Sequence, residues 1–387
     1  MKNPAKKLFV CTLTLLMLFS QSLACTAITL VNKKGDVVSG RTMEWALNWN
    51  WQLIYIPKGT QHYLTAPSNL DLLKQEYKSK YSVLATGLSK DGQTLVIDGQ
   101  NSQGLSLSAN YLPGFTKYQT VNKNDTKYAS IIESTTFILS QFANVSQAKQ
   151  GLENYKIWSD KSIMIDGISP EVHFLITDKS GAGLVVEYID GKVKFYNVNS
   201  NVKVMTNAPT YDWQLLNLKN YLSLDNRTPT NLKISDVINT DKHQRTVQDI
   251  SGFLGGGLLG IPGDYSPPSR FIRVAAIGYY ANNKAPEEDA DLVSKVTHIL
   301  HNVDIPKGVV ADELQGKKMF DHTAYVVIKD LNDNKLYIST YNHPNDPVVV
   351  DLNTLDKDNS KGFDIVLEKL PFPNTDITNK LANTSKS

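Results

Sequence analysis

The sequence predicts an α+β fold in which long meandering sheets are covered by a few helices. Three observations support this fold class. Short runs rich in β-branched and aromatic residues occupy both ends of the chain, and stretches with helical periodicity interrupt them. No repeat, low-complexity linker or shift in composition divides the chain. We therefore expect a single domain over residues 25–387.

The N-terminal part of the chain predicts strands joined by tight turns. The candidate strands are Thr26–Val31, Val37–Thr42, Ser82–Leu88, Thr94–Asp98 and Gly104–Asn110. A polar turn at residues 32–36 joins the first two strands, and Asp91-Gly92, a dipeptide typical of hairpin turns, joins the next two. Two hairpins are therefore expected here.

Helical patterns occur in the middle of the chain and again before the last group of predicted strands. They cover Tyr128–Phe142, Ser146–Tyr155, Ser269–Tyr280 and Pro286–Asn302. In the first stretch, Ile131, Phe137 and Ile138 are spaced to lie on one face. Ser146 is the expected N-cap of the second helix. Pro286, followed by three acidic residues, suits the N-terminus of the last.

Further strands are expected between these helices and after them. They are His173–Thr177, Leu184–Ile189, Val193–Asn197, Thr323–Lys329, Lys335–Thr340 and Val348–Leu352. After Pro373 the chain is polar, and we expect this tail to be disordered.

The composition is that of an ordinary globular protein. The chain has 387 residues, of which 41% are hydrophobic and 20% charged. This balance excludes intrinsic disorder and collagen-like repeats. With 40 Lys and Arg against 38 Asp and Glu, the formal charge is +2. So small an excess of positive charge argues against a nucleic-acid partner.

Residues 1–24 have the three parts of a secretory signal peptide. Met1–Lys7 is basic, Leu8–Phe19 is apolar, and Ser22 and Ala24 are the small residues that precede a cleavage site. The apolar run is too short for a transmembrane helix, and no later stretch reaches the necessary length. We therefore predict an exported protein, periplasmic or secreted, without a membrane span.

Cleavage after Ala24 would leave Cys25 as the N-terminal residue and the remaining cysteine of the chain. Lipidation is one explanation, but the usual signal has Leu three residues before the cysteine, where this chain has Ser22. A thiol without a role is the second. The third is an N-terminal nucleophile, because an α-amine with a pKa of about 7.7–8.0 is a suitable general base. Position and pattern favour the third explanation and leave the other two open.

Other motifs do not support a cofactor or a metal. Residues 255–260 match the glycine spacing of a dinucleotide-binding loop, but Pro262 and Gly263 follow where a helix is required. His298 and His301 share a helix face without a third ligand at a recognisable spacing. No G-x-S-x-G elbow is present. We expect neither a cofactor nor a metal.

Several segments resemble one known family. They are Cys25-Thr26-Ala27-Ile28-Thr29-Leu30, Gly40-Arg41-Thr42-Met43-Glu44-Trp45, residues 103–111, residues 205–209, residues 261–266 with 269–271, and residues 323–325. In this order, and with the N-terminal cysteine, they resemble the choloylglycine hydrolase family, which includes bile salt hydrolases and penicillin V acylases. The resemblance implies an N-terminal nucleophile hydrolase with two antiparallel sheets in a four-layer αββα sandwich. It also implies removal of the residues before the cysteine and a homotetramer.

The resemblance assigns roles near the new N-terminus. Cys25 resembles the family nucleophile, whose thiol attacks an amide carbonyl while its α-amine takes and returns the proton. Arg41 resembles the arginine beside that thiol, where a positive charge favours thiolate. Glu44 falls where many members have the aspartate that orients the α-amine, and the longer side chain is a departure from the pattern. A surface ion pair between Arg41 and Glu44 is the structural alternative.

The remaining assignments come from three distant segments. Asn110 and Asn207 match the family's active-site asparagines, with amide N–H groups expected to bind the oxyanion and the amine or substrate respectively. Arg270 matches the second family arginine, and Arg273 competes with it for that role. Turn positions for the asparagines, and a solvated helix start for Arg270, are the structural alternatives.

The substrate has to be inferred from aromatic residues near the nucleophile. Trp45, Trp49 and Trp51 follow Arg41, and Tyr111 follows Asn110. Trp45 and Tyr111 are our candidate substrate-binding residues, although indoles commonly fill a core instead. The resemblance leaves conjugated bile acids, penicillin V and N-acyl homoserine lactones open. We predict hydrolysis of linear amides with a bulky apolar acyl group; the non-enzymatic alternative is an exported lipoprotein or binding module anchored through its cysteine.

Overall fold

The computed structural model describes residues 24–47, 49–90, 93–165, 168–227, 256–283, 291–314 and 317–373. The expected signal peptide before Ala24, the expected turn at Asp91-Gly92 and the expected disordered tail after Pro373 lie outside the described residues. None of the helices in the described part is long and apolar enough to cross a membrane.

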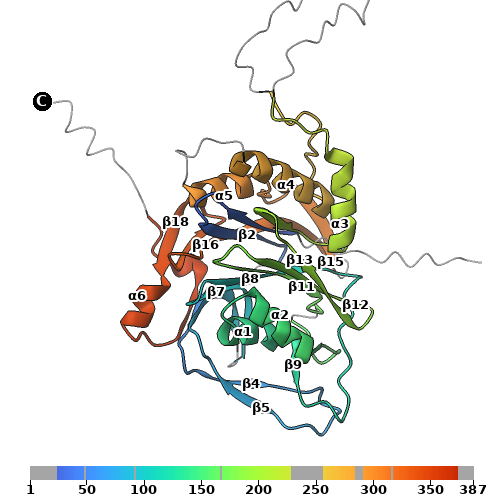
Figure 1. Ribbon diagram of the computed structural model, residues 1–387, viewed down its shortest axis with the longest axis vertical. Helices are drawn as coiled ribbons and strands as arrows, with labels where there is room; N and C mark the ends of the chain where they lie inside the picture. The colour runs from blue at the N-terminus through green and yellow to red at the C-terminus, as the bar shows by residue number, and fades with distance from the viewer. Residues whose placement is uncertain are drawn as a thin grey trace, which may run out of the picture.

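Two antiparallel sheets form the body of the protein (Figure 1). The first sheet contains, in spatial order, β14 (Val202–Met205), β1 (Cys25–Val31), β2 (Val37–Trp45), β16 (Lys317–Asp330), β17 (Lys335–Thr340) and β18 (His343–Asp351), with β15 (Val310–Leu314) also paired to β16. The second contains β13 (Lys192–Asn197), β12 (Gly183–Ile189), β11 (Val172–Asp178), β8 (Leu105–Tyr111), β7 (Gln93–Asn101), β6 (Val83–Lys90), β3 (Gln52–Ile56) and β19 (Phe363–Val366).

Helices cover the outer face of each sheet. Helices α4 (Pro267–Asn283) and α5 (Leu292–His301) pack on β1 of the first sheet, and α1 (Ile131–Gln141) and α2 (Val145–Asn154) pack on the second (Figure 1). The result is the expected four-layer αββα sandwich. The smaller elements are β4 (Gln61–Leu64) with β5 (Gln75–Lys78), β9 (Tyr128–Ser130) with β10 (Lys156–Trp158), α3 (Tyr211–Leu218), η1 (Lys219–Tyr221), α6 (Leu352–Lys357) and η3 (Leu367–Lys369).

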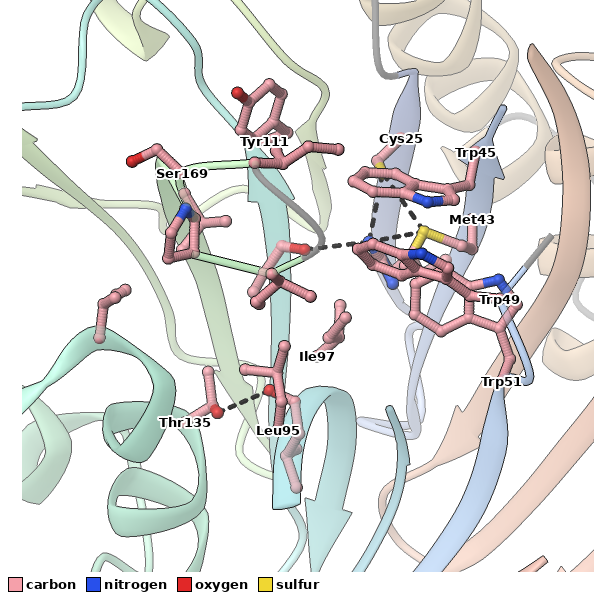
Figure 2. Close-up of a pocket in the computed structure, with 18 residues that line it drawn as sticks. Cys25, Met43, Trp45, Trp49, Trp51, Leu95, Ile97, Tyr111, Thr135 and Ser169 are labelled. Atoms are coloured by element: carbon pink, nitrogen blue, oxygen red, sulfur yellow. Dashed lines mark hydrogen bonds between the residues drawn. The ribbon is translucent and has the colours of Figure 1, made fainter. Parts of the chain in front are cut away.

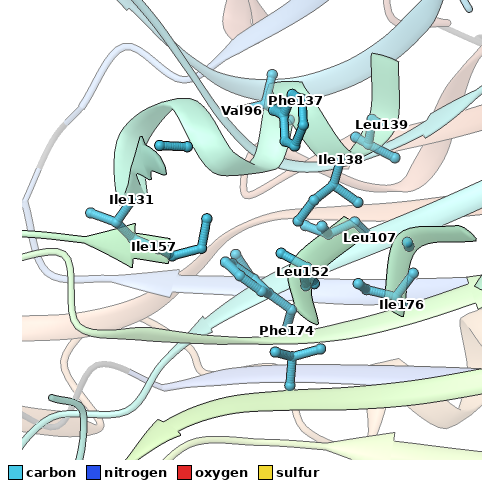
Figure 3. Packing of buried hydrophobic residues seen from close by; sticks show 14 of the residues in the cluster. Val96, Leu107, Ile131, Phe137, Ile138, Leu139, Leu152, Ile157, Phe174 and Ile176 are labelled. Atoms are coloured by element: carbon cyan, nitrogen blue, oxygen red, sulfur yellow. The ribbon is translucent and has the colours of Figure 1, made fainter. Parts of the chain in front are cut away.

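Each pair of adjacent layers encloses its own hydrophobic cluster. Figure 3 shows the cluster below α1 and α2, where Phe137 and Ile138 of α1 meet Leu107 of β8 and Phe174 of β11. Between α5 and the first sheet the packing is close enough to require a glycine. A Cβ on Gly40 would lie 2.6 Å from a methyl group of Val296. The sheets are thereby fixed relative to their helices, and the cluster between the sheets borders the site described below.

Two helix boundaries predicted from the sequence are wrong. The helix expected to begin at Tyr128 begins at Ile131, because Tyr128–Ser130 pairs with β10, and Ser130 with Glu133 then forms a capping box. Asn144, whose side chain accepts the N–H of Gln147, is the N-cap of α2 in place of Ser146.

Most of the other long elements agree with the sequence prediction to within a few residues. The exceptions are β16 and β18, which begin at Lys317 and His343, well before the predicted Thr323 and Val348. Helix α4 extends the predicted Ser269–Tyr280 at both ends. Asp291 caps α5, whose first helical residue is Leu292; the predicted start at Pro286 lies outside the described residues.

Candidate active site

The β1–β2 hairpin brings Cys25 and Arg41 together. In the register of this hairpin, Cys25 lies opposite Met43, and Ala27 lies opposite Arg41. Opposed residues and residues two apart share one face of a sheet. Cys25, Met43 and Arg41 therefore all face the second sheet, and Arg41 reaches across to donate to the carbonyl of Ala109 on β8 at 3.0 Å. The local hairpin alone is enough to place the thiol next to a guanidinium.

The thiol of Cys25 is enclosed by this face. The residue is 2% exposed, and its Sγ lies 3.2 Å from Nη2 of Arg41 and 3.9 Å from the sulfur of Met43. Burial raises the pKa of the Cys25 thiol, and the positive charge of Arg41 opposes this rise. Arg41 thus acts in the predicted direction, but burial outweighs it. In the uncleaved chain the net effect favours the protonated thiol, so an attack by Sγ requires a base.

Arg41 is held in one orientation by two further groups. Its Nε donates to Oδ1 of Asn110 at 3.1 Å, and its Nη1 lies 3.4 Å from the hydroxyl of Tyr325. Both residues are buried, as is Arg41 at 1% exposure. The structural alternative of an exposed Arg41–Glu44 ion pair is therefore wrong, because neither side chain reaches the surface.

The Cys25 nitrogen has a defined acceptor. It donates to Oδ1 of Asn207 at 2.6 Å, and Nη2 of Arg270 donates to the same oxygen at 2.7 Å. Arg270 also binds the carbonyl of Cys25 through Nη1 at 2.7 Å. In the uncleaved chain this nitrogen belongs to the Ala24–Cys25 peptide bond, so it marks the position that an α-amine would take after cleavage.

Arg270, rather than Arg273, is the second arginine at the cysteine. Nη1 of Arg273 donates to the carbonyls of Pro262 and Asp264 at 2.9 and 3.1 Å, and so it braces the loop before α4. Arg270 lies in the first turns of α4, fully buried, which excludes the solvated position considered for it.

The two asparagines occupy different positions. The amide nitrogen of Asn110 donates to the carbonyls of Met205 and Thr206, at 3.1 and 3.0 Å. Asn110 thereby ties β8 to the segment that carries Asn207, and its predicted contact with an oxyanion stays a prediction. Asn207 donates one N–H to the carbonyl of Tyr111 at 2.8 Å. The turn alternative is wrong for Asn110, which lies in β8, whereas Asn207 lies in a bend after β14; both are at most 2% exposed.

Glu44 lies near the cysteine but binds hydroxyl groups. Its carboxyl oxygens accept from Thr42 at 3.0 Å and from Thr323 at 2.9 Å, and its N–H donates to the carbonyl of Ala24. Burial raises the pKa of Glu44 to about 8, with Arg270 opposing the rise. The predicted contact of Glu44 with the α-amine stays a prediction for the cleaved chain.

Comparison with known proteins identifies this arrangement. A family model described as linear amide C–N hydrolases, choloylglycine hydrolase family, matches residues 25–363. This chain belongs to the choloylglycine hydrolase family. It is 30% identical to a bile salt hydrolase/transferase from Clostridium perfringens, over 88% of this chain and 95% of that protein. It is 29% identical to a penicillin V acylase from Pectobacterium atrosepticum, over 55% of this chain and 57% of the acylase.

Solved structures give the same result. A variant of conjugated bile acid hydrolase from Clostridium perfringens superimposes with a TM-score of 0.74 and 27% identity, over 90% of this chain and 99% of that one. A penicillin V acylase from Agrobacterium tumefaciens, at 21% identity and a TM-score of 0.65, covers 89% of this chain and 92% of its own, and it supports the fold alone. The protein is a hydrolase that acts on linear amides.

An apolar cavity adjoins Cys25 (Figure 2). About 620 Å³ around it is free of protein atoms, part of it open to solvent. Both candidate substrate-binding residues, Trp45 and Tyr111, line it. Its other lining residues are Cys25, Arg41, Met43, Trp49, Trp51, Leu95, Val96, Ile97, Ala109, Ile131, Thr135, Ile165, Ile168, Ser169, Pro170 and Val172.

Three indoles form one wall of the cavity. The ring centroids of Trp45 and Trp49 are 4.4 Å apart, and those of Trp49 and Trp51 are 5.3 Å apart. Tyr111 and Ser169 lie across the cavity from them (Figure 2). Sequence reasoning did not single out Ile165, Ile168 and Ser169, because they lie outside every predicted helix and strand and carry no periodic signal.

Proposed function

We propose that this protein hydrolyses linear amides whose acyl group is bulky and apolar, with conjugated bile acids and penicillin V as candidate substrates. One observation carries the proposal: the Cys25 thiol, in contact with Arg41, borders a cavity lined almost entirely by aromatic and aliphatic side chains. Such a wall favours an apolar acyl group by removing its surface from water. The names of the relatives in both sequence and structure comparisons support the same substrate classes.

The proposed reaction uses two groups of one residue. After cleavage of the Ala24–Cys25 bond, the α-amine accepts the thiol proton as Sγ attacks the amide carbonyl. The C–N bond then breaks, the α-amine returns the proton to the leaving amine, and a thioester remains on Cys25. Water attacks the thioester carbonyl while the amine again accepts a proton. The C–S bond then breaks, the carboxylic acid is released, and the ammonium returns the proton to Sγ.

Asn207 and Arg270 support this chemistry. Oδ1 of Asn207 accepts a hydrogen bond from the Cys25 nitrogen, which becomes the α-amine. This bond would orient the lone pair of the amine toward the thiol. The sequence resemblance assigned the oxyanion to Asn110, but the amide nitrogen of Asn110 already donates to two carbonyls. Asn207 uses one N–H on Tyr111, so its second N–H can bind the oxyanion instead. Arg270 fixes Asn207 and adds positive charge near the developing anion.

We also propose that residues 1–24 are removed on export to the periplasm or the medium, and that the mature chain assembles as a homotetramer. The basic, apolar and small-residue parts of the N-terminus support export, and the family resemblance supports the tetramer. A lipid anchor on Cys25 is disfavoured by its burial, because an anchored cysteine has to reach a membrane surface. Intact mass of the purified protein and light scattering test cleavage and assembly.

A substrate panel tests the proposed function. Purified mature protein is incubated with a conjugated bile acid, penicillin V and an N-acyl homoserine lactone, and the released amine is quantified. We expect release from at least one of the first two, and none by Cys25→Ala. Release from the lactone alone would assign the alternative acylase activity, and a diacylglyceryl group on Cys25 would support the lipoprotein instead.

A further inference from the structure

A buried histidine and glutamate lie behind the segment that carries Asn207. His173 on β11 and Glu187 on β12 are 1% and 0% exposed. Nε2 of His173 lies 2.9 Å from the carbonyl oxygen of Thr206, and Nδ1 lies 3.1 Å from Oε1 of Glu187. The Thr206 oxygen also accepts from Asn110 at 3.0 Å. This carbonyl therefore has two donors, and the next residue holds the Cys25 nitrogen.

We propose that His173 and Glu187 are positioning residues for the N-terminal amine. Together they fix the Thr206 carbonyl and so keep Oδ1 of Asn207 within hydrogen-bond distance of the Cys25 nitrogen. Neither residue lines the cavity or hydrogen-bonds to the cysteine among the described contacts. They act through the backbone of residues 206 and 207. The inference rests on the proposed function, because the amine matters only as the base of that reaction.

The hydrogen bonds restrict the protonation state of the pair. A carbonyl oxygen can only accept, so Nε2 of His173 carries a hydrogen. Oε1 of Glu187 also accepts the backbone N–H of Tyr211, the first residue of α3, at 2.8 Å. As part of the proposal, Glu187 is a carboxylate, whose oxygens can only accept. Nδ1 then carries a hydrogen as well, and His173 is an imidazolium whose charge is balanced by Glu187.

Replacement of Glu187 by Gln keeps the shape of the pair and removes this balance. The Gln oxygen can still accept from Tyr211 and from Nδ1. Because an unpaired buried cation is unfavourable, His173 would lose a proton from Nε2 and keep the one on Nδ1. Lone pairs of Nε2 and of the Thr206 carbonyl would then face each other. The carbonyl has to move away, and Asn207 moves with it.

A spectroscopic measurement tests this step without any turnover. Histidine ring nitrogens of the full-length folded protein are observed in ¹H–¹⁵N correlation spectra at neutral pH, and His173→Gln assigns the resonances of His173. We expect both nitrogens protonated in the wild type and Nε2 bare in Glu187→Gln. A neutral His173 in the wild type, or an unchanged spectrum in the variant, would overturn the proposal while leaving the proposed function untouched.

Kinetics test the consequence, on whichever amide the wild type hydrolyses. We expect Glu187→Gln and His173→Leu each to lower kcat by about 10- to 100-fold with KM changed less than about twofold. Because the two residues act as a unit, the double variant should be no slower than the slower single variant. His173→Gln, whose amide can still donate to Thr206, should recover part of the loss. Additive losses, or equal activity of the Gln and Leu variants, would contradict a positioning role.

Asp178→Asn is the matched control. Asp178 is a buried carboxylate on the same strand as His173, and its Oδ2 accepts the N–H of Val145, the first residue of α2, at 2.9 Å. It therefore makes the same kind of helix contact as Glu187 without a contact to residues 206 and 207. We expect kcat of this variant to stay within about twofold of the wild type. If kcat of Asp178→Asn fell as much as that of Glu187→Gln, the effect of Glu187→Gln would be explained by a general loss of stability, and the positioning role would be refuted.

Discussion

Glu44 should make the protein less stable as the pH rises, and Glu44→Gln should remove this dependence. The carboxyl group is fully buried, and burial raises its pKa to about 8. In the unfolded chain its pKa is about 4.3. Between these two values the folded state binds a proton that the unfolded state does not. The contribution of the protonated Glu44 to the stability of the folded state is therefore fully present below about pH 4. It is lost as the pH rises through about 8.

The magnitude follows from the separation of the two pKa values. Each pH unit in this interval changes the free energy of unfolding by about 1.4 kcal/mol per group. Between pH 5 and pH 7.5, Glu44 should thus lower the free energy of unfolding by about 3 kcal/mol. Asp321, fully buried with neither carboxyl oxygen partnered among the described residues, acts in the same direction, because burial raises its pKa to about 7. Measuring Asp321→Asn in the same way separates the contribution of Asp321 to the pH dependence from that of Glu44.

Urea denaturation at half-unit pH steps measures this effect. A Gln side chain matches the protonated acid and can keep both threonine contacts, so the variant should resemble the wild type near pH 5 and exceed it increasingly toward pH 7.5. The difference in unfolding free energy should grow by about 3 kcal/mol over that range. Parallel stability curves for wild type and Glu44→Gln would refute the reasoning, since they would mean that Glu44 is ionised in the folded protein.

Three further outcomes are expected. Cys25→Ala should lower amide turnover by several orders of magnitude while circular dichroism and the melting temperature stay near wild type; an active variant would place the nucleophile elsewhere. Arg41→Ala should slow alkylation of Cys25 by iodoacetamide at neutral pH, because the charge that opposes the burial effect on the thiol pKa is lost, and Arg41→Lys should restore the rate in part; superimposable rate–pH profiles would contradict this. Trp49→Ala should raise KM about tenfold for a bulky acyl group and little for an acetyl amide, and equal effects on both would argue against an acyl pocket.

The first hairpin could be predicted from the sequence because its information is local. A polar turn lies between two runs of β-branched residues, and the register of that turn places Arg41 on the face of Cys25. By contrast, β4 and β5 are short, polar and largely exposed, so they carry no alternating apolar pattern. Strand β19 is an edge strand with half-exposed residues, and it escaped prediction for the same reason.

The start of α1 shows a signal that was present but outweighed. Apolar residues from Tyr128 onward fit a helical period, yet a run that short fits a strand equally well. Ser130 followed by Glu133 is the capping-box pattern that marks the true boundary. Local capping chemistry was the better guide to this boundary than hydrophobic spacing.

The site beyond the hairpin could not be derived from spacing. Asn110, Asn207 and Arg270 come from β8, the segment after β14 and α4, and only the folded sandwich brings them to Cys25. The family resemblance identified these three residues, but it could not identify their hydrogen-bond partners. That Asn207 rather than Glu44 accepts the Cys25 N–H follows from distances that no one-dimensional pattern contains. Likewise, burial outweighs Arg41 at the thiol because the sheets close over it.

The central claim is that Cys25 carries the acyl group during turnover. Mature enzyme is mixed with excess amide substrate, quenched in acid within the first turnover, digested and examined by mass spectrometry. The account predicts that the peptide containing Cys25 gains the mass of the acyl group less one hydrogen, and that hydroxylamine at neutral pH removes this mass, as expected for a thioester. Turnover with an unmodified Cys25 peptide at every quench time, or acylation at another residue, would contradict it.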